Sequence, residues 1–566
     1  MREARFGAIK VRRATLTIVN KHKRQAAECY NFCMSPKQKW IFSLLLVIAA
    51  AAFVLFSRPN AVASDNLAMV MMFEPDEAGP LPWMLRMIEP DENLDKTLRG
   101  FLFYGYYYYG FPYFALSALL VLPLQWLGQI QNMPLVMLVL RNGISVLPMM
   151  AALLLLVYLQ DGFRTYRSPL LFIFLLSVPA VVSNNFWWHP DSLTFLMAML
   201  VLFFLLRDDL RFGRNFVAAA FFTGILTATK LIGLYFFLAV GLTLLLGLIL
   251  KKASLKKLAG MSLAYVATMA VAFVIGNPFL LSSWARLEYR YTLNKQTALL
   301  SDGYGVVYEK GLLTAWPVMH ENYGEAAFLL AALAVAIWGA WRGPRKRLFG
   351  LILAWFLPLT ISLMIMTHFK YQYWLPVVLP LFSCLVVLLP ERPSWNWAAV
   401  RGRLLQAGLV GLVLVQFGLF LSGDVKRYND RLHRADGNER IAFYEQSVNT
   451  LQPLNDAGVP LTVYYDYRMY LPDTPGWSIE TNFELLEYSY FEERNFAVVF
   501  LLEQRIRDYL NEGVQGIDPV SFARNQAFYR DADTDHFRGY HLAYRNKVGL
   551  VYIRDDLWQQ YYAANP

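Results

Sequence analysis

Three acids stand close together in the stretch Glu-Pro-Asp-Glu at 74–77, shortly after the first long apolar run of the chain. Carboxylates beside a membrane span are costly unless they face water or serve a function. The proline between them opposes a continuous helix through the stretch. We therefore predict that Asp76 and Glu77 belong to a catalytic site, and the alternative is a solvated loop beside the membrane. The same four residues recur fifteen positions later, so the alternative acids are Asp91 and Glu92.

A second set of polar residues stands where later apolar runs begin or end. His-Pro-Asp at 189–191 adds the carboxylate of Asp191, and Thr-Lys at 229–230 places a lysine between two apolar runs. A carboxylate can serve as a general base or a metal ligand, and a lysine can bind a phosphate. Each residue has a structural alternative, since Asp191 could cap a helix and Lys230 could extend to the membrane interface. The candidate binding residues are His189, Lys230, His320, Glu321, His368 and Lys370.

The composition places these residues in an integral membrane protein. Of the 566 residues, 57% are hydrophobic. Apolar runs of about twenty residues recur, each long enough to cross a hydrocarbon core of ~30 Å. The net charge of +10 comes largely from Lys and Arg clusters between these runs, a pattern typical of cytoplasmic loops and not of nucleic acid binding. The cysteines indicate neither a disulfide framework nor a zinc site; they are Cys29, Cys33 and Cys384.

The positive-inside rule decides the predicted topology. We expect the tyrosine-rich run at 101–127 to lie along the interface or to dip into the membrane and return, without crossing it. Tyr104–Tyr109 would form an aromatic belt, and the alternative is that they stack on a sugar or a prenyl chain. The later Lys and Arg clusters then all fall in the cytoplasm. The prediction is a polytopic α-helical protein with about 11–13 spans in residues 40–422, a basic cytoplasmic tail at 1–39 and a first exoplasmic loop at about 58–135. The candidate site residues then share the outer side of a plasma membrane or bacterial inner membrane.

Residues 423–566 have the composition of a soluble domain. Short apolar stretches at 461–465, 496–502 and 548–553 predict strands, and helical patterns separate them. We therefore expect a small α/β domain on the exoplasmic side. The sequence shows no glycine-rich phosphate loop and no nucleophile elbow there, so it assigns this domain no chemistry of its own.

A site on the outer face constrains the chemistry, because nucleotide-activated sugars of the cytosol do not reach it. A donor carried in the lipid, such as a sugar on a polyprenyl phosphate, does reach it. The phosphate leaves without protonation, so the protein needs a base for the acceptor and cations or a metal for the phosphate. No cofactor is certain. A Mg²⁺ or Mn²⁺ ion, if one is used, would be held by Asp76, Glu77, Asp191 and His189.

The order of these features resembles the GT-C superfamily of membrane glycosyltransferases, in particular the protein O-mannosyltransferase and lipid A aminoarabinose transferase branches. Pro75–Glu77 is similar to the acidic motif of the first loop, and His189–Asp191 to the acidic position of the second. Thr229-Lys230 resembles the lysine that meets the donor phosphate. Asn277-Pro278-Phe279 and the run from His368 to Pro376 resemble later landmarks. The resemblance covers roughly residues 40–390. The chain has Gly110-Phe111-Pro112 where these branches often carry His-Pro-Pro or Lys-Pro, and the second acidic stretch is not part of the family pattern.

The resemblance implies an inverting glycosyltransferase that moves a sugar from a polyprenyl-phosphate carrier to an exoplasmic or periplasmic glycan, lipid or protein. It implies that Asp76 deprotonates the acceptor, that Glu77 and Asp191 orient it or bind a metal, and that Lys230 and Lys370 hold the phosphate. One alternative is a transporter or a flippase for lipid-linked sugars, which should show inverted repeats and a site at mid-membrane. Another is a membrane-anchored sensor, which leaves the carboxylates and Lys230 unexplained.

Overall fold

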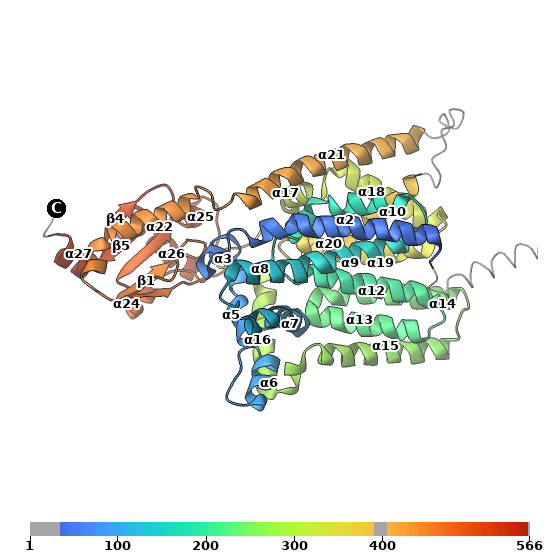
Figure 1. Ribbon diagram of the computed structural model, residues 1–566, viewed down its shortest axis with the longest axis horizontal. Helices are drawn as coiled ribbons and strands as arrows, with labels where there is room; N and C mark the ends of the chain where they lie inside the picture. The colour runs from blue at the N-terminus through green and yellow to red at the C-terminus, as the bar shows by residue number, and fades with distance from the viewer. Residues whose placement is uncertain (1–33, 390–403, 564–566) are drawn as a thin grey trace, which may run out of the picture.

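A bundle of apolar helices is joined end to end with a small α/β domain (Figure 1). This computed structural model describes residues 34–389 and 404–563. The predicted basic tail at 1–39 lies almost wholly outside these ranges, as do Cys29 and Cys33. Cys384 is a buried free thiol. The architecture confirms the predicted class, a polytopic helical protein with a C-terminal α/β domain.

Seven helical segments in the described ranges are long and apolar enough to cross a membrane, and an eighth span forms if two helices that meet at 82° cross as one. This bent pair is α17 (Leu312–Tyr323) and α18 (Ala326–Arg342). Three further spans predicted from apolar runs at about 169–184, 193–206 and 216–229 correspond to helices that are short or carry charged ends. These helices are α10 (Arg167–Leu176), α12 (Asp191–Asp208) and α13 (Arg214–Thr229). The seven segments contain α2 (Pro36–Ala61), α8 (Met133–Leu140) with the π-helix η1 (Arg141–Val146) and α9 (Leu147–Asp161), η2 (Leu231–Phe237) with α14 (Leu238–Ile249), α15 (Leu255–Ile275), α19 (Lys346–Ile365), α20 (Tyr371–Ser383) with η4 (Cys384–Leu388), and α21 (Leu404–Leu432).

The centre of the bundle is formed around α20. In its most apolar stretch 83% of the residues are buried, compared with 17% in α15 and 11% in α21. The two outer helices expose long apolar side chains such as Leu263 and Leu405. An apolar face directed outward is what a helix in contact with lipid requires.

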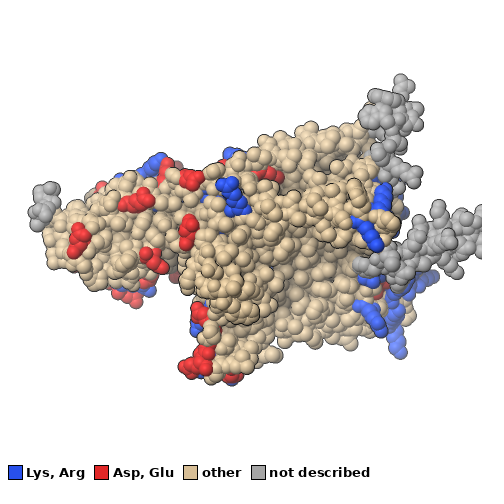
Figure 2. Space-filling model, in the orientation of Figure 1, with Lys and Arg blue, Asp and Glu red and all other residues tan. Residues whose placement is uncertain are grey.

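The two ends of the molecule differ in charge: the α/β domain shows side chains of both signs, and the remote end of the bundle is mainly basic (Figure 2). Lys and Arg gather at the end of the bundle remote from the α/β domain, and most of the visible Asp and Glu lie on the domain and on the adjoining end of the bundle (Figure 2). Lys251 and Lys252, which follow α14, belong to the basic loops of the sequence. This polarity agrees with the predicted placement of the basic loops in the cytoplasm.

Short helices between α2 and α8 form a layer at the end of the bundle that adjoins the α/β domain (Figure 1). Tyr104 and Tyr107 are buried in this layer, where their rings contact Phe114 and Phe279. The prediction of an interfacial belt was therefore wrong for these two tyrosines, because they supply the core of the layer. Its helices are α3 (Leu67–Phe73), α4 (Pro75–Ala78), α5 (Leu81–Arg86), α6 (Leu94–Leu102) and α7 (Phe111–Trp126).

The C-terminal domain is built on a five-stranded sheet with the order β2-β1-β3-β5-β4. β1 (Leu461–Tyr465) pairs in parallel with β2 (Trp477–Glu480) and with β3 (Val498–Leu502). β5 (Gly549–Arg554) runs antiparallel between β3 and β4 (Tyr540–Arg545). The three predicted strands are confirmed as β1, β3 and β5, and the structure adds two half-buried strands at the edges.

Helices cover both faces of the sheet and complete a three-layer domain. Two apolar clusters, one on each face, join the helices to β1, β3 and β5. The change of composition at 423 lies inside α21, which continues as one helix from the bundle toward the domain. The helices of one face are α22 (Glu439–Thr450), α23 (Gln452–Asp456) and α27 (Asp555–Tyr561), and those of the other are α24 (Tyr488–Arg494), α25 (Glu503–Leu510) and α26 (Pro519–Asp533).

Candidate active site at the end of the helical bundle

The carboxylate of Glu77, in the single turn of α4, is fully buried and already saturated with hydrogen bonds. Arg141 donates to it from Nε at 2.9 Å and from Nη2 at 2.5 Å, and the backbone N–H of Trp188 donates at 2.5 Å. Arg141 is itself buried in the π-helix η1, a local form frequent at functional sites. A carboxylate held by a bidentate arginine and a backbone amide is fixed in place. This geometry suits Glu77 for positioning the loop and not for taking a proton.

Arg141 extends the contact to the end of the first span. Its Nη1 donates to the carbonyl of Asn60 at 2.8 Å, and the Asn60 amide donates to Asn142 at 2.8 Å and to the carbonyl of Asn185 at 2.9 Å. A buried polar network therefore joins α2, η1 and the segment before α12. Arg141 was not among the sequence-predicted residues, although a charge inside a predicted apolar span is itself a signal of function.

Glu74 is neutralised as well, by two arginines of α21. Arg431 and Arg434 both contact its Oε1, Arg434 at 2.9 Å. Arg431 also donates to the carbonyl of Phe186. Burial alone would raise the pKa of Glu74, but the charges of Arg431, Arg434 and Arg141 outweigh it and hold the pKa below its ordinary value. The acidic stretch is thus tied to α21 at one end and to η1 at the other.

Asp76 lies between these two anchored glutamates and makes no hydrogen bond or ion pair with the rest of the described chain. Its side chain is exposed. Burial raises the pKa of Tyr106 and of Tyr109, and the charge of Asp76 raises both further, so its carboxylate lies near these two hydroxyls. The short helix α4 therefore holds an open carboxylate in a defined place.

Asp191 brings a lysine and a histidine together at the start of α12. Nζ of Lys230 lies 2.5 Å from Oδ1 of Asp191, and Nδ1 of His189 contacts Oδ2. Nε2 of His189 meets the hydroxyl of Tyr109 at 2.9 Å. The carboxylate makes no capping hydrogen bond in α12, so helix capping does not account for it. The charge of Asp76 reaches both His189 and Lys230. We call Asp76, Tyr109, His189, Asp191 and Lys230 the central cluster.

Lys230 stands at a break between helices, as the sequence predicted. α13 ends at Thr229, Lys230 is extended with φ −155° and ψ 130°, and η2 follows. Nζ of Lys230 lies 4.2 Å from the ring centroid of Tyr373, within cation–π distance. Lys370 is near enough for its charge to repel that of Lys230. The positive charges of Lys230 and Lys370 repel each other, and Asp191 is paired with Lys230, so the break is attractive to an anion.

The tyrosine-rich loop reaches this break through a close contact at Gly110. Its N–H donates to the carbonyl of Thr229 at 3.2 Å. A Cβ at position 110 would lie 1.6 Å from the carbonyl oxygen of Ala228, so only glycine permits the approach. Phe111 N–H donates to Oδ1 of Asn277 at 3.4 Å. These contacts of Gly110 and Phe111 with Thr229 and Asn277 fix the end of the tyrosine-rich loop. Tyr109 therefore lies beside His189.

The second acidic stretch lies apart, on the surface. Asp91 accepts from the backbone N–H of Glu92 at 2.7 Å, and Glu92 pairs with Lys96 one helical turn later. All three side chains are exposed. The structure therefore places Asp76, and not Asp91, in the central cluster.

The remaining predicted binding residues take different positions. His320 pairs with Glu325 at 2.9 Å and Glu321 contacts Arg427 at 3.5 Å, so their partners lie outside the central cluster. His368 packs on Tyr308 with ring centroids 4.6 Å apart. Burial and the nearby charge of Lys370 lower the pKa of His368. Of this group, Lys370 acts on Lys230 of the cluster, and His368 lies near Lys370.

The charges of the site are balanced by basic side chains. Within residues 34–389 and 404–563, no three His, Cys, Asp or Glu side chains are arranged to hold a metal ion. Arg141 neutralises Glu77 and Lys230 neutralises Asp191, which leaves Asp76 as the one open carboxylate of the predicted metal set. This arrangement does not fit a Mg²⁺ or Mn²⁺ site, which needs several oxygen ligands.

Comparison with known proteins gives a fold but no sequence family. No family model and no curated protein matches the chain. Among solved structures, ArnT from Cupriavidus metallidurans bound to undecaprenyl phosphate is similar, with a TM-score of 0.52 and 12% identity over 90% of this chain and 97% of that one. The apo structure of ArnT from the same organism has a TM-score of 0.48 and 11% identity, over 90% of this chain and 98% of that one. ArnT is a GT-C lipid A aminoarabinose transferase, so the resemblance predicted from the sequence is confirmed at the level of the fold: the chain has the fold of ArnT.

Proposed function

We propose that this protein is an inverting glycosyltransferase that moves a sugar from a polyprenyl-phosphate carrier to an acceptor at the exoplasmic membrane surface. The observation that carries the proposal is the open carboxylate of Asp76 within electrostatic reach of Lys230, whose ammonium is paired with Asp191, at one end of an apolar bundle. A candidate base and a candidate anion site thus lie at the same end of the bundle. The similar ArnT structure contains undecaprenyl phosphate, which supports a carrier of this kind.

The donor phosphate binds at the break after α13 in this proposal. Lys230 has three ammonium hydrogens, so it can keep Asp191 and donate to a phosphate oxygen at the same time. Lys370 adds a second positive charge. His189 is held toward the site by Asp191 and Tyr109. The polyprenyl chain then lies against the apolar helix faces that the bundle directs to lipid.

Transfer is a single displacement. As the acceptor hydroxyl or amine attacks the anomeric carbon, Asp76 takes its proton. The bond between that carbon and the phosphate oxygen breaks, and the phosphate leaves with the electron pair, stabilised by Lys230 and Lys370. Attack opposite the leaving group inverts the anomeric centre. Glu77 does not touch substrate in this mechanism; it positions α4 through Arg141.

The distribution of charge supports the orientation that the proposal requires. The end of the bundle rich in Lys and Arg faces the cytoplasm, and the N-terminus of α2 starts there (Figures 1 and 2). The central cluster and the C-terminal domain then lie on the exoplasmic side of a plasma membrane or bacterial inner membrane. Cytosolic nucleotide sugars cannot reach such a site, in agreement with a lipid-linked donor.

The test is transfer by the purified protein in lipid vesicles. Labelled undecaprenyl-phosphate sugars serve as donors, and glycans and glycolipids extracted from the cell envelope serve as acceptors. The wild type should form a labelled product with inverted anomeric configuration. A product with retained configuration would remove the single-displacement mechanism. A wild type that transfers nothing, but carries the lipid-linked sugars across the bilayer, would replace the proposal with a flippase or transporter.

A further inference from the structure

A buried polar network that the proposed chemistry does not use lies at the carboxyl ends of the parallel strands. Asp466, directly after β1, accepts from the backbone N–H of Leu502 at 2.8 Å and from Nη1 of Arg505 at 2.8 Å. Arg505 also donates to the carbonyls of Asn482 and Glu484, at 3.4 Å and 3.2 Å. The network holds the loops after β1, β2 and β3 together, at the edge where open α/β sheets bind ligands.

The loop fixed by Asp466 presents an aromatic ring and a guanidinium. The Tyr467 ring lies 5.0 Å from that of Phe483, which is 48% exposed. Arg468 is exposed and has a left-handed backbone with φ +70°. A non-glycine residue in this conformation is strained, and such strain clusters at functional sites. Arg440 donates to the carbonyl of Arg468 at 3.0 Å and secures the loop from the other side.

A segment of the bundle, residues 302–309 between α16 (Ser283–Ser301) and α17, attaches this domain to the active-site end. We call it the strap. The N–H of Val307 donates to the carbonyl of Gln515 at 2.8 Å, and the N–H of Ile517 donates to that of Gly305 at 3.0 Å. These bonds form a short antiparallel bridge between the two parts of the molecule. The strap therefore keeps the Tyr467 loop at a defined distance from the bundle.

The strap carries two tyrosines, Tyr304 and Tyr308. Burial raises the pKa of Tyr304 to about 12, with contributions from the charges of Asp76 and Tyr467. Tyr308 packs on His368 at 4.6 Å between ring centroids, and Tyr467 is again among the groups that raise its pKa, after burial. The strap thus carries two aromatic side chains that Tyr467 influences, and Asp76 influences Tyr304 as well.

We propose that Tyr467, Arg468 and Phe483 bind the non-reacting part of the acceptor, and that this acceptor is a saccharide. Aromatic rings pack against the apolar faces of sugar rings, and a guanidinium donates to hydroxyl or acid oxygens in a fixed geometry. Tyr304 then guides the reacting group toward Asp76. The inference rests on the proposed transferase function and gives the C-terminal domain the task of acceptor selection.

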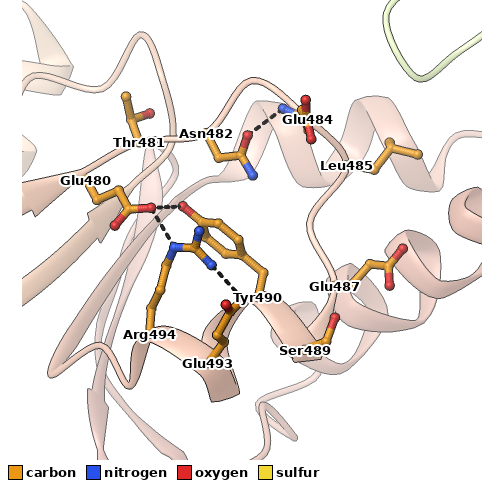
Figure 3. Close-up of a pocket in the computed structure, with 10 residues that line it drawn as sticks. All are labelled: Glu480, Thr481, Asn482, Glu484, Leu485, Glu487, Ser489, Tyr490, Glu493 and Arg494. Carbon is orange, nitrogen blue, oxygen red and sulfur yellow. Dashed lines mark hydrogen bonds and ion pairs between the residues drawn. The ribbon is translucent and has the colours of Figure 1, made fainter.

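A cavity of about 460 Å³ at the carboxyl end of β2 offers a competing site (Figure 3). Neither Tyr467 nor Phe483 lines it. Figure 3 shows the carboxylate of Glu480 turned to Tyr490 and Arg494, at 2.5 Å and 2.8 Å, so these polar groups satisfy one another. The cavity therefore supplies matched control residues in the same domain.

The test compares acceptor and donor parameters of the full-length protein in lipid vesicles. The acceptor probe is the envelope oligosaccharide fraction released by mild acid, and the donor-side probe is undecaprenyl phosphate. Arg468→Gly should raise the acceptor KM at least about tenfold, as loss of a central binding residue does. Glycine adopts φ +70° freely, so this variant keeps the fold. Phe483→Ala should act in the same direction, and Tyr467→Phe, which keeps the ring, should stay near wild type. Affinity for undecaprenyl phosphate should not change in any of them.

The controls separate the outcomes. Asp535→Gly makes the same change at another exposed left-handed residue of the domain, and Arg494→Gln alters the cavity. Both should leave the acceptor KM unchanged. An unchanged KM in Arg468→Gly and Phe483→Ala, with active wild type, would overturn this inference and leave the transferase proposal standing. A raised KM in Arg494→Gln alone would move the acceptor to the cavity and also overturn it. A wild type without transfer would remove both proposals.

Discussion

The chain contains the stretch Glu-Pro-Asp-Glu twice, and the two copies have opposite surroundings. In the first copy, Glu74 contacts two arginines of α21 and Glu77 is enclosed by Arg141, so Asp76 stands open between two anchored neighbours. In the second copy, at 89–92, all four side chains are exposed. The same four residues therefore hold the Asp76 carboxylate in a fixed position in the first copy and form a solvated turn in the second.

The difference lies in partners that are distant in the sequence. Glu77 and Arg141 are 64 positions apart, and Glu74 and Arg431 are 357 apart. Among the described residues, the second copy has one ion-pair partner, Lys96, four positions from Glu92, and the backbone N–H of Asp91 donates to the nearby hydroxyl of Thr97. Buried charges need such partners, because an unpaired charge in a low-dielectric interior is strongly unfavourable. Tertiary structure, and not the local motif, decides which copy is suited to chemistry.

Breaking the buried pair should have the largest effect on stability. Glu77→Gln leaves the Arg141 guanidinium buried without a counter-charge, and both side chains have no exposed surface. The expected loss is about 3–5 kcal/mol of unfolding free energy. Thermal unfolding in detergent checks this. Glu92→Gln, the equivalent change in the second copy, is the control. A Glu77→Gln protein as stable as wild type would show that the pair does not hold α4.

Removing the open carboxylate should reduce activity and leave stability intact. Asp76→Asn keeps the size of the side chain but cannot accept the proton, so transfer should fall by at least about two orders of magnitude, roughly 2.7 kcal/mol of barrier. Asp91→Asn should transfer at the wild-type rate. The measurement is initial rate at saturating donor, with unfolding temperature as a second readout. Equal loss in the two variants, or none in Asp76→Asn, would contradict the assignment of the base.

Glu74→Gln should lower the stability of the protein by an intermediate amount that depends on pH. The pKa of Glu74 in the folded protein lies below its ordinary value of 4.5, so its contribution to stability is present above pH 4.5 and is lost as the pH falls through the folded-state pKa. At pH 7 the variant should lose about 1–3 kcal/mol, because its hydrogen bonds with arginine lose the charge. Unfolding temperatures at several pH values between 7 and 3.5 measure this.

The matched control for that series is Glu89→Gln, at the first position of the exposed copy. Wild type and Glu89→Gln should destabilise in parallel as the pH falls below 4.5. The difference in unfolding temperature between wild type and Glu74→Gln should disappear over the same pH range. A gap that stays constant at all pH values would mean that the arginine contacts act by packing alone.

The helical architecture was largely predictable, because an apolar run of about twenty residues in the sequence directly indicates a membrane-spanning helix. The break at Lys230 and the three central strands were also predicted, since a lysine between two apolar runs and short apolar stretches are local signals. The convergence of Asp76, His189, Asp191 and Lys230 followed from their shared side of the membrane. Their roles in transfer stay predictions.

What the sequence did not predict depends on contacts between distant segments. The roles of Arg141, Arg431 and Arg434 required the fold, as did the change of interpretation for Glu77 from catalysis to positioning. Tyr104 and Tyr107 have the composition of an interfacial belt, yet they are buried because Phe114 and Phe279 pack against them. No local pattern distinguishes a tyrosine at a lipid interface from one in a protein core.

The smallest expected change in stability comes from breaking the exposed Glu92–Lys96 pair of the second copy. The dependence of this change on salt tests the difference between the two copies. Glu92 and Lys96 are one helical turn apart and both open to water, so Lys96→Ala should change stability by at most about 0.5 kcal/mol at low salt. In 1 M salt, where screening acts over about 3 Å, this difference should vanish. The loss in Glu77→Gln should persist there, since no ions reach the buried pair. A stability loss in Glu77→Gln that depends on salt would mean that solvent reaches the Glu77–Arg141 pair. The two copies would then differ only in how far their ion pairs are exposed to solvent.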